Sequence, residues 1–250
     1  MNDIYAAPEA DLAQDIEADR AGGNIDDAVS GNFEVNMLET LGEAWRGLKG
    51  FKLKCLIAIL LYMAVFIGVG IVFGIFSTVL ARTGADPGVI GILSLIFQIV
   101  ITVIALPMSI AVMVMAMRHA NRKSVSAGEI FRHFGVVGTL FLAYLIMTIM
   151  IMLGLVLLVL PGIYLMFAYI YAMPLALEKK MGAWHALETS RKATTKVWFR
   201  LVGLLLLISL INMLGFLTIV GWIWTIPWTV LTFSMIYQKI FGVEAHTLAD

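Results

Sequence analysis

The sequence predicts an all-α membrane protein with six transmembrane helices, arranged as three hairpins that each follow a cytoplasmic amphipathic helix. The first observation is composition, because 61% of the residues are hydrophobic and 14% are charged, against roughly 45–50% and about 25% in soluble domains. The second is a set of four long runs without a formal charge. The third is the distribution of lysine and arginine, which fall on one side of those runs. A soluble protein of this composition could not build a polar exterior.

Residues 1–34 differ from the rest of the chain and are predicted to be a disordered, acidic cytoplasmic tail. They carry nine acids and one base, Arg20. The segment has neither the basic start nor the apolar stretch of a secretory signal, and it offers little apolar surface to offset its ordering entropy. An alternative is that the tail docks on a basic surface of the same protein. Residues 35–250 form the predicted transmembrane domain.

The charge-free runs cover residues 55–81, 87–117, 136–177 and 201–238. A helix needs about 20 residues to cross a bilayer, so the first two runs are predicted to be single spans and the last two to hold two spans each. Pro161 and Gly162 favour a division into 136–160 and 161–177, because proline fits the first turn of a new helix. Gly221, followed by two tryptophans that suit the headgroup layer, favours a division into 201–220 and 221–241.

The loops between the predicted spans determine the expected orientation. Sixteen of the 17 lysines and arginines lie before the first span, in the second and fourth loops, or after the last span, and only Arg82 lies on the opposite side. Cytoplasmic loops of membrane proteins are enriched in these bases. We therefore expect both termini to be cytoplasmic.

Three short segments precede the hairpins, at residues 37–48, 126–134 and 182–192. Each has a glycine, a cluster of polar and apolar residues, and then a base. Ser126 and Glu129 have the spacing of a capping box. Apolar residues on one face with bases nearby are typical of helices that lie among anionic headgroups. The pattern fits a degenerate threefold repeat, or else the general character of loops beside a membrane.

The sequence contains no recognisable catalytic, metal-binding or phosphate-binding motif. The four runs contain no Asp, Glu, Lys, Arg or His, which disfavours a proton-coupled transporter. The four histidines form no ligand pair, and Cys55 is the single cysteine. Neither a phosphate-binding loop nor a nucleophile elbow occurs. We therefore expect no catalytic residues, no metal and no cofactor, and we interpret Glu178 and Glu188 as solvated partners of nearby bases.

Several stretches resemble a bacterial family of six-helix integral membrane proteins that has no assigned activity. They are Leu160–Tyr164, Tyr169–Leu175, Gly182 with Ala186–Ser190, Gly221–Pro227 and Tyr237–Gly242. The family is similar to the membrane portion fused to some glycerophosphodiester phosphodiesterases, and the resemblance covers roughly residues 37–242. It implies the six-helix fold, an envelope membrane and a link to lipid. The sequence shows no phosphodiesterase domain, so that activity is not carried over.

The leading functional hypothesis is a non-enzymatic inner-membrane protein that organises or senses anionic lipid. The bases proposed to bind lipid headgroups are Lys49, Lys52, Lys54, Arg122, Lys123, Lys179, Lys180, Arg191, Lys192 and Lys196. One alternative is a small-molecule or lipid transporter or channel whose path passes Gln98 and Asn212, two residues that otherwise serve helix packing. Another is a membrane anchor subunit of a larger complex. No nucleic-acid partner is expected, and a protein partner or homodimer stays open.

Overall fold

The computed structural model describes residues 22–218 and 220–249, and within them the chain is helical and contains no strand. The elements, in chain order, are α2 (Ile25–Ser30), α3 (Met37–Gly47), α4 (Lys52–Arg82), α5 (Pro87–Ala120), the 3-10 helices η1 (Ala127–Phe131) and η2 (Phe134–Val136), α6 (Val137–Leu157), α7 (Val159–Ala168), α8 (Ala172–Glu178), α9 (Ala183–Lys196), α10 (Trp198–Leu217), α11 (Trp222–Phe241) and α12 (Ala245–Leu248).

Five helical stretches in the described residues are long and apolar enough to cross a membrane. They are Lys52–Arg82, Pro87–Ala120, Ala127–Leu157, Val159–Glu178 and Trp198–Leu217. The sixth predicted span forms as α11 at the expected position but does not belong to this group. Its tryptophans, threonines and Gln238 lower its hydropathy, and most of its polar side chains are buried against other helices. The all-α architecture is therefore confirmed for the described residues, with five helical stretches that are candidates to span a membrane.

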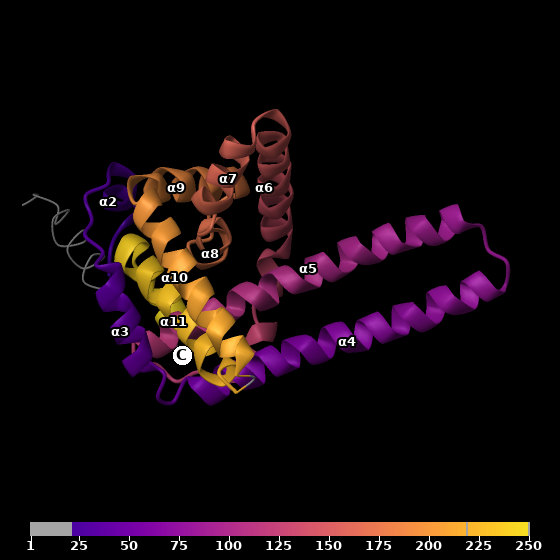
Figure 1. Ribbon diagram of the computed structural model, residues 1–250, viewed down its shortest axis with the longest axis horizontal. Coiled ribbons are helices and arrows are strands. Elements are labelled where there is room, and N and C mark those ends of the chain that lie inside the picture. Colours follow the sequence, from indigo (N-terminus) through magenta and orange to yellow (C-terminus); the bar gives the residue numbers. More distant parts are fainter. Residues whose placement is uncertain (1–21, 219, 250) are drawn as a thin grey trace, which may run out of the picture.

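Helices α4 and α5 form a long hairpin that projects away from the other helices (Figure 1). The buried residues of α5 lie between Leu106 and Arg118, in its second half. In the projecting part, Phe73 of α4 stacks on Phe97 of α5 with ring centroids 3.9 Å apart. Around that contact, Val72 and Leu95 remain 69% and 67% exposed. Such an apolar surface suits contact with lipid, because soluble proteins rarely expose patches of this extent.

The second hairpin, α6–α7, turns three residues earlier than predicted. The break falls at Leu158, whose backbone is extended (φ −154°, ψ 119°). Pro161 lies inside the first turn of α7, where its missing N–H has no helical partner to lose. The predicted span 161–177 corresponds to the candidate span Val159–Glu178, but it is not one continuous helix, because residues 169–171 separate α7 from α8. Pro174 stands in the first turn of α8.

Both of the shorter hairpin turns are closed by pairs of glycines. In α6–α7, a Cβ placed on Gly154 would lie 2.9 Å from Gly162 Cα. In α10–α11, a Cβ on Gly221 would lie 2.6 Å from Gly215 Cα. No larger residue can stand at these positions without moving the backbone, so the glycines permit the two helices of each hairpin to approach at the turn.

The predicted tail boundary at residue 34 is too late. Helix α2 packs against α9 and α11, its N-terminus is capped by Asn24, and Ala28 is fully buried. Before it, the Gly23 N–H donates to the carbonyl of Gln238 at 3.0 Å. Ile25 and Phe33 also pack, partly buried, against the hydrophobic core. The rest of the predicted tail, 1–21, lies outside the described residues.

The three predicted amphipathic segments take different forms. Segment 37–48 contains α3, whose buried residues include Leu41 and Ala44. It packs on α11, where Trp228 Nε1 donates to the carbonyl of Leu41 at 3.0 Å. Segment 126–134 contains the 3-10 helix η1 and has the predicted capping box of Ser126 and Glu129. Segment 182–192 lies in α9, whose buried side packs against α6, α7 and α8.

Protein, rather than lipid, therefore covers the buried faces of α3 and α9. The amphipathic pattern was interpreted as a face that lies among headgroups, and for these faces the interpretation is wrong. Periodicity shows that a helix has an apolar side but does not show what covers it. Other large side chains do remain exposed on the two helices, namely Leu38, Trp45 and Trp184.

Candidate functional site

Half of the ten proposed headgroup-binding bases are exposed and unpaired. In the described residues these have no ion pair or hydrogen-bond partner: Lys49, Arg122, Lys123, Lys180 and Lys196. Lys54 is partly buried and also unpaired. Lys52 is engaged with an aromatic ring, because its Nζ lies 4.4 Å from the centroid of Trp224. These bases lie in the α3–α4 connection and the start of α4, in the α5–η1 connection, in the α8–α9 connection and at the end of α9.

The remaining three bases of that set are held by carboxylates. Lys179 Nζ lies 2.8 Å from Glu244 Oε1, and its side chain is only 3% exposed. Arg191 donates two hydrogen bonds to Glu188, at 2.9 and 2.7 Å, and Lys192 Nζ lies 3.5 Å from the same carboxylate. The hydrogen bonds from Arg191 hold the pKa of Glu188 below its usual range. The predicted pairing of Glu188 with Arg191 and Lys192 is confirmed.

Glu178 does not behave as a solvated partner, and that interpretation is wrong. The residue is 1% exposed. Its carboxylate accepts hydrogen bonds from the Tyr237 hydroxyl at 2.8 Å, the Glu244 N–H at 2.7 Å and the Thr247 hydroxyl at 3.3 Å. A buried carboxylate requires such donors. Glu178 thereby joins α8 to α11 and to the C-terminal segment, residues 242–249.

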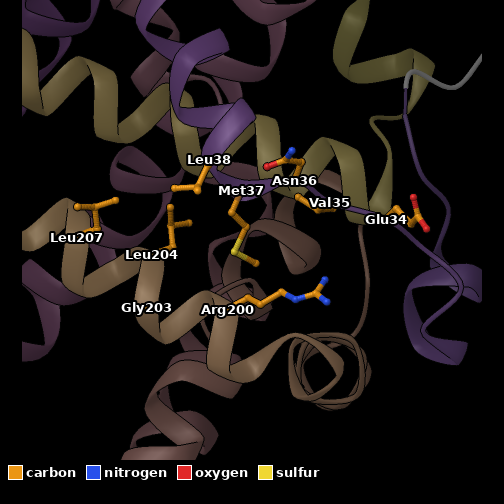
Figure 2. Close-up of a pocket in the computed structure, with 9 residues that line it drawn as sticks. All are labelled: Glu34, Val35, Asn36, Met37, Leu38, Arg200, Gly203, Leu204 and Leu207. Carbon is orange, nitrogen blue, oxygen red and sulfur yellow. The ribbon is translucent and has the colours of Figure 1, made fainter.

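A groove runs between the start of α3 and the first turns of α10 (Figure 2). Its volume is about 550 Å³, and it is lined by Glu34, Val35, Asn36, Met37, Leu38, Arg200, Gly203, Leu204 and Leu207. We call it the α3–α10 groove. One wall of the groove is formed by a single face of α10. Residues spaced three or four apart share that face, and here they are Arg200, Gly203, Leu204 and Leu207. One end of the groove is thus basic and the other is apolar.

Arg200 is the charged group of this groove that was absent from the set proposed from sequence. It is exposed, and in the described residues no carboxylate pairs with it. Figure 2 shows its side chain extending along the groove below Val35 and toward Glu34, whose carboxylate points away from the guanidinium. The available signal in the sequence was the position of Arg200 directly after Trp198 and Phe199 at the start of an apolar helix. Phe199 is 84% exposed.

Gln98 and Asn212, proposed as path-lining or packing residues, lie on different hairpins. Gln98 is exposed on the projecting part of α5. Asn212 of α10 donates to the Thr229 hydroxyl of α11 at 2.9 Å and to the carbonyl of Ile208 at 3.0 Å. Asn212 therefore links two helices, as polar side chains within membranes commonly do.

No group of three or more His, Cys, Asp or Glu side chains that could hold a metal ion occurs among the described residues. His119 Nε2 lies 3.0 Å from the Gly47 carbonyl. Comparison of the chain with protein-family models, with curated proteins and with solved structures finds no match.

Proposed function

We propose that this chain is a non-enzymatic inner-membrane protein that binds anionic phospholipid in the α3–α10 groove, with both termini cytoplasmic. The observation that carries the proposal is the unpaired Arg200 at one end of a groove whose far wall is Leu204 and Leu207. A phospholipid has the same division, with a negative phosphate attached to apolar chains. Guanidinium groups bind phosphate by charge-assisted hydrogen bonds.

The depth of the groove supports this occupant. Arg200 lies in the first turn of α10, a candidate membrane span that begins at Trp198. Bases and aromatic residues at the end of a span belong at the level of the lipid headgroups. Leu204 and Leu207, one and two turns further along, then lie at the depth of the acyl chains. Glu34 is the one carboxylate of the lining, and it points away from Arg200 (Figure 2).

Exposed bases elsewhere would add a weaker, unspecific attraction. Each Lys or Arg near an anionic membrane surface contributes about 1 kcal/mol. The unpaired side chains of Lys49, Arg122, Lys123 and Lys196 are available for this, whereas Lys179 is buried in an ion pair. Arg200 therefore makes the specific contact with the lipid, and the exposed bases contribute a general attraction to the anionic membrane surface.

The test is the Arg200→Gln variant in nanodiscs or detergent, with retained phosphatidylglycerol counted by native mass spectrometry. Loss of one charge-assisted contact, about 1.5–3 kcal/mol, should lower affinity for phosphatidylglycerol about tenfold or more. Lys192→Gln is the matched control, since it removes an exposed charge that lies outside the groove and should change affinity little. Equal retention by both variants would refute the proposal.

A second variant tests the apolar wall while Arg200 stays in place. Gly203 lines the groove, and a Cβ there would meet nothing within 4 Å. Gly203→Phe should therefore fill the groove without disturbing helix packing and displace the lipid. Phosphatidylglycerol bound as tightly as to the unmodified chain would mean that the lipid lies elsewhere.

Deleting residues 2–21 should strengthen binding to anionic vesicles, most visibly at low salt. The deleted segment contains six acids and one base, so its removal makes the net charge of the chain more positive, and salt screens such long-range effects. The deletion should stop at residue 21, because residues 22–34 pack against α9 and α11. Vesicle flotation at two salt concentrations measures the effect, and unchanged binding at both would exclude a screening role.

A further inference from the structure

A second cavity lies under the C-terminal segment and is unlike the α3–α10 groove in its chemistry. Its volume is about 320 Å³, and its apolar floor includes Val114 and Leu177. The charged and imidazole side chains that line it come from α5, η1, the following turn, α8, the α8–α9 connection and α12. They are Arg118, Glu129, Arg132, His133, Glu178, Lys180 and His246. We call it the C-terminal cavity.

The two carboxylates of this lining already have hydrogen-bond donors and a nearby base within the protein. Glu178 accepts hydrogen bonds from three donors and lies 3.8 Å from Lys179 Nζ. Glu129 accepts from the Ser126 N–H at 2.9 Å, and its other oxygen lies 3.6 Å from Arg118 Nε. Neither carboxylate is therefore left to pair with the other bases of the cavity.

Two cations remain. Arg132 and Lys180 line the cavity, both are exposed, and in the described residues neither has an ion pair or a hydrogen bond. His133 and His246 add ring nitrogens from two further segments. The cavity thus brings together two unpaired positive charges from elements far apart in the chain. An arrangement with this excess of positive charge complements a ligand with several negatively charged oxygens.

We propose that the C-terminal cavity binds the phosphate group of a small ligand, with Arg132 and Lys180 supplying the charge-assisted hydrogen bonds. A guanidinium fork and an ammonium point charge together suit a tetrahedral phosphate better than a single carboxylate. The cavity volume of about 320 Å³ lies at the small end of ligand sites, which are commonly about 300–1,000 Å³. This site is separate from the α3–α10 groove and does not rest on the function proposed for it.

The test is calorimetric titration of the full chain, in uncharged detergent, with inorganic phosphate and with glycerol 3-phosphate at constant ionic strength. Saturable binding is expected. The double variant Arg132→Gln/Lys180→Gln should weaken it at least tenfold. The matched control is Arg122→Gln/Lys123→Gln, which removes the same two kinds of exposed, unpaired charge outside the cavity. Arg200→Gln should bind both ligands as the unmodified chain does, which separates this site from the groove.

A second arm distinguishes a free phosphate from a lipid headgroup. Nanodiscs of phosphatidylcholine, with and without phosphatidic acid, present the same phosphate monoester on a lipid. If only phosphatidic acid binds, and the double variant loses that binding, the phosphate that the site accepts belongs to a lipid. If the unmodified chain binds none of the three probes, or the double variant binds them as tightly as the matched control does, the proposal is wrong.

Discussion

Replacing Glu178 with leucine should lower the free energy of unfolding by about 3–5 kcal/mol, the usual cost of removing one partner from a buried charged pair. The variant leaves the Tyr237 hydroxyl and the Glu244 N–H without their acceptor. It also removes one of the carboxylates near Lys179. Thermal unfolding in detergent measures the loss, and limited proteolysis of residues 242–249 should show that the C-terminal segment is released.

Glu188→Leu is the matched control for this prediction. Both glutamates lie within four residues of two bases in the sequence. The Glu188 side chain, however, is 28% exposed, and its partners lie on the same helix. Exposed pairs of this kind contribute about 0–1 kcal/mol. We therefore expect a small change in unfolding temperature and an intact C-terminal segment. Similar losses in the two variants would show that Glu178 does not anchor this segment.

Replacing Gly162 with alanine should open the α6–α7 turn. The added Cβ would lie 2.6 Å from the Leu155 backbone nitrogen and 2.4 Å from Leu155 Cγ. A rotation of the leucine side chain cannot relieve the backbone clash, so the helices must separate, at a cost of about 1–3 kcal/mol for overpacking. Met152 of α6 and Met166 of α7 are both exposed and can carry spin labels. Double electron–electron resonance should show a longer or broader distribution of the distance between these labels than in the unmodified turn.

Gly138→Ala on α6 provides the control, because a Cβ there meets nothing within 4 Å. Replacing an unconstrained helical glycine by alanine stabilises by roughly 0.5–1 kcal/mol. The spin-label distance should stay unchanged in this variant. If Gly162→Ala also left the distance and the unfolding temperature unchanged, the close approach of the two helices at this turn would be disproved.

The positions of the long helices could be predicted from sequence to within a few residues. The charge-free runs 55–81 and 87–117 correspond to α4 and α5, and their bounds follow from the cost of placing charges in hydrocarbon. The turn after α6 could not be placed as accurately. Pro161 marks the start of a helix, but proline is tolerated at more than one position of a first turn. The interruption at residues 169–171 lies inside a uniformly apolar run, so no local signal marked it.

The candidate sites were predictable only in part. The sequence identified a surplus of bases beside the spans, but it did not separate Lys179, buried in an ion pair, from Lys180, which is exposed. It did not single out Arg200. Glu244, the partner of Lys179, comes from a segment distant in the chain, and no pattern of spacing records that contact. Residues 22–34 were likewise treated as solvated because the helices that cover Ala28 come much later in the sequence.

Composition and the length of the charge-free runs predict an α-helical membrane protein, because helices satisfy the backbone within lipid, and the described residues form five helical stretches that suit this prediction. Which polar side chains are buried and paired, and which stay exposed for a ligand, depends on the tertiary contacts. Glu178 and Lys179 are buried in one network with the partly exposed Glu244, whereas Arg200 and Arg132 line two separate cavities and have no ion pair among the described residues. Burial and pairing depend on contacts between distant segments, and these exist only once the chain is folded.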